Sequence, residues 1–200
     1  MPLPPAQPRH QIHTRRITFQ AYRRDDGLWD IEAELHDSKT HPLELPYERV
    51  WQAGEPIHGI QLRVTIDTQM VVRDIAASMN DVPHGNCQQA LPPLHHMVGS
   101  TLGPGWRKAI EQHLGGVQGC AHVRELLFNV ATAAFQALPG GLSGTASANQ
   151  PPMHLGQCVT WDFNGPLVQK LYPVYFQHPS NNNKAAVKTA APSGSTSTAP

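Results

Sequence analysis

The sequence predicts an α+β domain in which two antiparallel β-hairpins form a sheet that helices cover on one face. Three observations support this fold class. Apolar and polar residues alternate with a period of two within residues 15–35, and they do so again within residues 60–77. Beyond residue 80 the apolar spacing becomes helical, most clearly within residues 121–138. The chain has 200 residues, 40% of them apolar, which is enough for one globular domain of ordinary size.

Two alternating runs around a turn motif predict the first hairpin. Ile17, Phe19 and Ala21 share one face of the first run. In the second run, residues 29–35 direct apolar side chains to one face and acidic ones to the other. Asp25-Asp26-Gly27 lies between the runs, and its Asp-Gly step supplies the positive φ of a tight turn. The prolines within residues 40–57 predict an ordered loop rather than a strand.

The second hairpin is predicted from residues 60–77. Apolar side chains occupy every second position of residues 60–66, residues 67–69 form the turn, and residues 70–77 return along the sheet. Three helices should follow. A short helix is expected after Pro92-Pro93, a second over residues 106–114, and the longest over residues 121–138.

Composition divides the rest of the chain. Residues 1–14 and 179–200 are predicted to be disordered tails on either side of the domain at residues 15–138. Residues 139–157 have the Gly, Ser, Ala and Pro content of a linker. Residues 158–178 are rich in apolar side chains, and we expect this segment to dock back on the domain because it would otherwise promote aggregation.

The charge balance argues against two classes of partner. Fifteen Lys and Arg residues offset fifteen Asp and Glu residues, so no overall positive field attracts nucleic acid or an anionic membrane. No apolar run is long enough to span a bilayer, and the first residues lack the apolar region of a secretory signal. These features predict a cytoplasmic location.

The three cysteines are the first candidates for chemistry. An odd number in a chain without an export signal predicts free thiols or metal ligands rather than disulfides. Cys120 and His122 open the longest predicted helix, where unpaired backbone N–H groups stabilise a thiolate. Cys87 lies just before the first predicted helix, so both thiols are expected at helix starts. The alternative is that each cysteine is a small buried hydrophobe.

Five segments carry a family resemblance: residues 22–30 (YRRDDGLWD), 54–58 (GEPIH), 62–67 (LRVTID), 119–126 (GCAHVREL), and the tail from Cys158 to Tyr172-Pro173. Through them, residues 15–177 resemble the bacterial family called domain of unknown function 2889. The family usually has Thr where this chain has Ala121. The resemblance implies no known activity.

A more distant resemblance covers residues 54–137. The Gly54-Glu55-Pro56 loop, the strand at residues 62–67, and Cys87 and Cys120 ahead of an Ala-rich helix are similar in order to IscU/NifU-type iron–sulfur scaffold proteins. The loop thiol of those scaffolds is missing here, with His58 nearby, and the imidazole before the last thiol has moved to His122.

This second resemblance implies an IscU-like topology and a metal site. The implied ligands are Cys87, Cys120 and His122, completed by Cys158 or His58, and the implied cofactor is zinc or an iron–sulfur cluster. The chain would then be a carrier or scaffold-like module that delivers metal or cluster to a protein partner.

Two alternatives stay open. The first alternative to a metal carrier is a small-molecule enzyme with Cys120 as nucleophile and His122 as base. The second is a purely structural or interaction domain. The enzyme alternative is disfavoured, because side chains two apart in a regular helix diverge by about 200°. The sequence also has no phosphate loop, nucleophile elbow, His-Glu-x-x-His motif or dinucleotide fingerprint.

Overall fold

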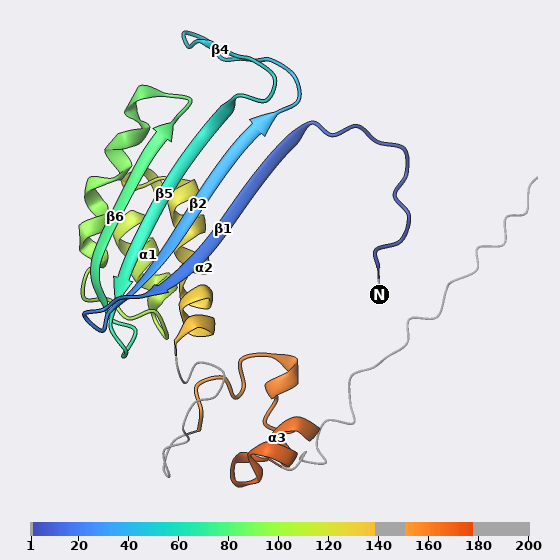
Figure 1. Cartoon of the computed structure of the whole chain (residues 1–200), viewed down its shortest axis with the longest axis vertical. Helices are drawn as coiled ribbons and strands as arrows, with labels where there is room; N and C mark the ends of the chain where they lie inside the picture. The colour runs from blue at the N-terminus through green and yellow to red at the C-terminus, as the bar shows by residue number, and fades with distance from the viewer. Residues whose placement is uncertain (1, 139–150, 178–200) are drawn as a thin grey trace, which may run out of the picture. The chain divides into compact units, whose positions relative to one another are not determined.

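The chain forms two units, residues 1–143 and 144–200, and each is considered by itself. A computed structural model describes residues 2–138 and 151–177. The first unit is built on an antiparallel sheet of four strands in the order β1-β2-β5-β6. Helices cover one face of this sheet, which confirms the predicted α+β class (Figure 1). None of the described helices is long and apolar enough to cross a membrane.

The first hairpin is confirmed. Strand β1 (His13–Arg23) pairs with β2 (Trp29–Lys39) over its whole length without a register shift. Gly27 has φ +87°, which an L side chain rarely adopts, so glycine suits this turn. The structure corrects the predicted N-terminal tail at residues 1–14, because His13 and Thr14 already pair with β2.

The second hairpin is also confirmed, with longer strands than the alternation predicts. Strands β5 (Pro56–Ile66) and β6 (Val72–Asp81) are joined through Asp67, whose carboxylate accepts hydrogen bonds from the backbone N–H groups of Gln69 and Val71. The predicted loop at residues 40–57 contains two short paired strands, β3 (Leu43–Glu44) and β4 (Val50–Trp51). Trp51 is 3% exposed, so burial of its ring anchors this small arm.

Two α-helices match the predicted periodicity. Helix α1 (Trp106–Leu114) and helix α2 (Ala121–Ala137) begin and end within one residue of the expected bounds. The region of the first predicted helix is different. There Gly85–Ala90 (η1) and Pro92–Met97 (η2) are 3₁₀ turns instead of an α-helix. Pro92 and Pro93 are the first residues of η2, as expected for a helix start, but the turn is only six residues long and keeps the 3₁₀ form. A further 3₁₀ turn, Gly116–Gln118 (η3), lies between α1 and α2.

The core lies between the inner face of the sheet and the helices. Alternate residues of β2 and β5 face α1 and α2, and their side chains are almost fully buried: Ile31, Ala33, Leu35, Ile60, Leu62, Val64 and Ile66. Helix α2 contributes Val123, Leu126, Leu127, Val130 and Ala134. This packing fixes the start of α2 over the end of the sheet where β2 finishes and β5 begins.

The second unit has its own small core. It contains turn η4 (Val159–Trp161), helix α3 (Pro166–Leu171) and turn η5 (Pro173–Tyr175). Its buried side chains include Val168 of α3, Leu155 and His154. Residues 151–157 belong to this unit, whereas residues 139–150 of the predicted linker lie outside the described residues. So do residue 178 and the predicted tail at 179–200. Docking of residues 158–178 on the first unit stays a prediction.

Candidate functional site

The inner face of the sheet ends in polar side chains instead of apolar ones. On β2 the buried positions run Ile31, Ala33, Leu35 and then Asp37, whose side chain is only 3% exposed. His58 of β5 is paired with Asp37 across the two strands, so both side chains lie on the inner face. The start of α2 brings His122 to the same place, where Nε2 is 3.9 Å from Oδ2 of Asp37.

Asp37 is the centre of this cluster. Its carboxylate accepts hydrogen bonds from Arg15, with Nε at 2.9 Å and Nη2 at 2.7 Å, and from Nδ1 of His58 at 3.0 Å. Nε2 of His13 is 3.1 Å from Oδ1 of the same carboxylate. A second carboxylate, Glu125 of α2, also accepts from Arg15 at 2.7 Å. Strands β1, β2 and β5 and helix α2 therefore all contribute to one polar cluster.

The cluster keeps Asp37 ionised. Burial by itself would raise the pKa of this carboxyl, but the hydrogen bonds and charge of Arg15, with smaller contributions from His58 and His13, lower it from 3.8 to about 2. For His58, burial lowers the pKa below its usual value and outweighs the opposing effect of Asp37. At neutral pH the cluster therefore contains an anionic oxygen donor beside an uncharged imidazole.

Three of these groups lie close enough together to hold a metal ion. One ligand atom from each of Asp37, His58 and His122 lies within 4.8 Å of the other two, and this is the one such group of three or more in the described residues. The rings of His58 and His122 are 4.1 Å apart between centroids. A tetrahedral ion with bonds of about 2.1 Å places its ligand atoms about 3.4 Å apart. Oδ2 of Asp37 is 3.0 Å from Nδ1 of His58 and 3.9 Å from Nε2 of His122, and these distances lie on either side of that value.

Cys120 contacts the opposite side of His122. Its Sγ is 3.7 Å from Nδ1 of His122. Burial would raise the pKa of this thiol, but the contact with His122 and the backbone N–H groups of Val123 and His122 lower it. The expectation that Cys120 and His122 diverge is wrong. Cys120 is the N-cap residue with φ −101° and ψ 133°, so it lies outside the regular helix.

The other predicted ligands are Cys87 in the first unit and Cys158 in the second. Cys87 is within the 3₁₀ turn η1 rather than at the start of an α-helix, and it is partly buried against the core. Cys158 is exposed in the second unit. Neither thiol belongs to a group of three or more metal-ligating side chains in the part of the chain that is described. Their role as ligands stays a prediction.

Asp37, Arg15 and His13 are members of the cluster that sequence reasoning missed. The signal was present in the alternation of residues 29–35, since one further step places Asp37 on the apolar face. His58 likewise shares its face with Ile60 and Leu62. An acid and an imidazole at inward positions of two strands indicate a buried polar pair, because a buried charge requires a partner.

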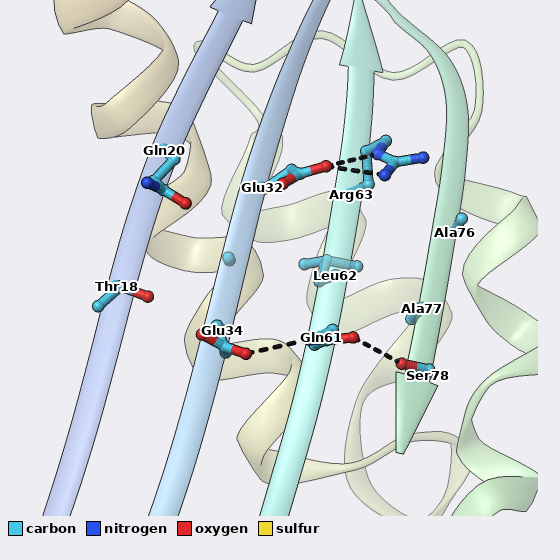
Figure 2. A pocket seen from close by; sticks show the side chains of 11 residues that line it. Thr18, Gln20, Glu32, Glu34, Gln61, Leu62, Arg63, Ala76, Ala77 and Ser78 are labelled. Atoms are coloured by element: carbon cyan, nitrogen blue, oxygen red, sulfur yellow. Dashed lines mark hydrogen bonds and ion pairs between the residues drawn. The ribbon is translucent and has the colours of Figure 1, made fainter. Parts of the chain in front are cut away.

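A hollow on the opposite, outer face of the sheet offers a second location (Figure 2). Its charged side chains have partners: Arg63 donates to Glu32 at 2.8 Å, and Gln61 donates to Glu34 at 3.0 Å. Ser78 completes the row through a 3.4 Å bond to Gln61. The charged groups in this hollow are paired with one another or with an amide and lie at the outer surface of the sheet, so the cluster around Asp37 is the stronger candidate site.

The sheet and the cluster lie within the part of the chain that known sequences resemble. The model of the family described as Protein of unknown function (DUF2889) matches residues 13–136, which contain every member of the cluster. Neither the curated proteins nor the solved structures include a match to this chain. The IscU/NifU resemblance thus has no support from these comparisons. With more than half of its residues matched, the chain belongs to the DUF2889 family.

Proposed function

We propose that this protein binds a divalent transition-metal ion, with zinc as the first choice, through Asp37, His58 and His122. The observation that supports the proposal is the approach of the three ligand atoms to within 4.8 Å of one another at the buried end of the sheet. Carboxylate oxygen and imidazole nitrogen are ordinary ligands of zinc. The ion would be carried rather than used in catalysis, and a protein partner would receive it.

The surrounding residues prepare the ligands for an ion. Arg15 holds the Asp37 carboxylate in place and keeps it charged, although its own positive charge also opposes the ion. His58 needs no deprotonation at neutral pH to be uncharged, because burial lowers its pKa. An ion bound at Nδ1 of His58 would require the ring proton that this nitrogen donates to Asp37 to lie on Nε2 instead.

The donor set favours zinc over an iron–sulfur cluster. Iron–sulfur clusters are held mainly by cysteine thiolates, whereas within the described residues of the first unit one thiol, Cys120, contacts this cluster. That thiol is next to Nδ1 of His122, and Asp37 is next to Nε2 on the far side of the same ring. An ion at Nε2 therefore leaves Cys120 outside its coordination sphere and has a position for water or for a ligand from the partner.

A specific observation favours a second candidate, in which the same residues perform thiol chemistry. Cys120, His122 and Asp37 form a thiol–imidazole–carboxylate series with separations of 3.7 Å and 3.9 Å. In this arrangement His122 takes the thiol proton and Asp37 orients the ring and stabilises its charge. The chain would then act on an electrophilic small molecule without a metal.

Cobalt(II) titration of the whole chain distinguishes the two candidates. Co²⁺ substitutes for zinc and gives visible absorption bands whose intensity reports tetrahedral ligation. We expect one equivalent to bind, and we expect His58→Ala and His122→Ala each to weaken binding at least tenfold. His36→Ala is the matched control, because His36 neighbours Asp37 on β2 but faces the outer side, where it contacts Glu34. Binding that persists unchanged in the His58→Ala, His122→Ala double variant would refute the metal site.

A further inference from the structure

Strand β1 forms one edge of the sheet (Figure 1). It spans 11 residues, and β2 pairs with all of them on one side. No other described strand pairs with its second side. Long edge strands are sites of strand addition, and proteins usually shorten, bend or interrupt them. Strand β1 contains no proline and no bulge, so its free edge is regular along the whole strand.

The hydrogen bonds at both ends of the hairpin identify the backbone groups on that edge. The N–H of Thr40 donates to the carbonyl of Ile12, and the N–H of Arg24 donates to the carbonyl of Leu28. Even-numbered residues of β1 therefore bond to β2, since residues alternate along an antiparallel strand. The odd-numbered residues direct their N–H and C=O groups away from β2: His13, Arg15, Ile17, Phe19, Ala21 and Arg23.

The side chains beside the middle of this edge are apolar. Ile17 and Phe19 are only partly buried although they contact the core, and Ala21 is exposed. The charge of Arg15, which would discourage an approaching strand, is neutralised by Asp37 and Glu125. The central part of the edge therefore combines unpaired backbone groups with apolar surface that a further strand would cover.

We propose that β1 pairs antiparallel with β1 of a second copy of this chain, and that the two sheets become one continuous sheet of eight strands. Thr18, the middle residue of His13–Arg23, lies on the two-fold axis and faces its own copy. A two-fold axis perpendicular to the sheet leaves the helices of both copies on the same face. This inference does not depend on the proposed metal site.

The sequence of β1 is complementary to itself in this register. Ile17 lies opposite Phe19 of the second copy, so the partly buried apolar side chains meet. Arg15 lies opposite Ala21, and Arg16 lies opposite Gln20, so no arginine faces another. Moving the axis to Phe19 shortens the overlap and places Arg15 opposite Arg23, which like-charge repulsion disfavours. The register with the longest overlap is therefore also the one with the best side-chain pairs.

Disulfide cross-linking tests the register. Side chains directly opposite in an antiparallel pair have Cβ atoms about 4.5–5.5 Å apart, close enough for a disulfide after a small adjustment. We expect Thr18→Cys to form a covalent dimer within minutes of mild oxidation. Gln20→Cys is the matched control on the same face, because the two copies of position 20 are four residues out of register, about 13 Å apart. Equal cross-linking of the two variants would overturn the register.

Sedimentation velocity of the whole chain tests the dimer itself. We expect wild-type protein at about 50 μM to sediment as a dimer and Ala21→Pro as a monomer with an unchanged circular dichroism spectrum. Proline at this position removes an N–H that faces away from β2, so the hairpin keeps its own hydrogen bonds. Ala21→Val, which keeps the N–H, should remain dimeric. A monomeric wild-type protein, or a folded Ala21→Pro variant that remains dimeric, would contradict the proposal.

Discussion

Replacing Asp37 by Asn tests the electrostatic account of the site most directly. A pKa change of one is worth about 1.36 kcal/mol. A carboxyl whose pKa falls from 3.8 to about 2 on folding therefore contributes up to about 2.4 kcal/mol to stability at neutral pH. Arg15 is one-third exposed, and solvent screening reduces this to about 1–2 kcal/mol. The variant also leaves the guanidinium of Arg15 without its buried carboxylate partner, which lowers the free energy of unfolding by a further amount of about 1–2 kcal/mol.

We therefore expect Asp37→Asn to lower the free energy of unfolding by about 2–4 kcal/mol at pH 7. The loss should depend on pH in a defined direction. The folded-state pKa of Asp37 lies below its unfolded value of 3.8, so its contribution is complete above about pH 5 and disappears as the pH falls through 3.8 toward 2. The stability difference between wild type and variant should shrink over the same range.

Urea unfolding of metal-free protein, at pH 7 and at steps down to pH 3, measures this difference through the midpoint and the slope. Glu34→Gln is the matched control, because Glu34 lies on the same strand but on the outer face, and its side chain is 41% exposed. We expect this control to change stability by less than about 1 kcal/mol. An Asp37→Asn loss no larger than that of Glu34→Gln, or one that is constant from pH 7 to pH 3, would refute the reasoning.

Three further predictions concern the site and the core. His122→Ala should slow the alkylation of Cys120 by iodoacetamide in metal-free protein, because the contact that lowers the thiol pKa is lost, and mass spectrometry of the labelled peptide measures the rate. Co²⁺ affinity should persist to lower pH than for a site of ordinary imidazoles, because burial lowers the pKa of His58, and spectroscopic titration from pH 7.5 to pH 5 checks this. Leu126→Ala should cost about 2–5 kcal/mol in urea unfolding, since Leu126 is fully buried.

The fold was largely predictable where local patterns determine structure. The alternation of residues 15–35 and 60–77 predicts both hairpins, and the spacing of residues 121–138 predicts α2, because each period assigns one face of an element to the core. The 3₁₀ turns η1 and η2 were predicted less well, because each has only six residues, too few for the apolar spacing to distinguish a 3₁₀ turn from an α-helix. The short strands β3 and β4 have only two residues each, too few for a period to appear.

The site was predictable only in part, because it depends on the register between segments distant in sequence. The resemblance to iron–sulfur scaffolds led to His58 and His122, which the structure brings together. It also led to Cys87 and Cys158, whose role as ligands stays a prediction. Asp37 carried no motif of its own. Its place at the centre of the cluster follows from its pairing with His58 across two strands and from the position of α2 over them. Neither relation is encoded in a local pattern.

The composition of this cluster argues for a role beyond stability. Buried ion pairs can often be replaced by apolar residues without loss of stability, because the free-energy cost of removing both charges from water offsets most of their mutual attraction. The inner face already supplies Leu35 and Ile60 beside the cluster, so two further apolar side chains at positions 37 and 58 would extend the core. The chain instead places an anion and imidazoles there, within reach of one ion and of a thiol. If the cluster served stability alone, a paired Asp37→Leu, His58→Leu variant would be at least as stable as wild type and would show no loss of metal binding or thiol reactivity. The metal-binding proposal predicts that such a variant folds but no longer binds the ion, whereas loss of thiol reactivity is expected only if the second candidate holds.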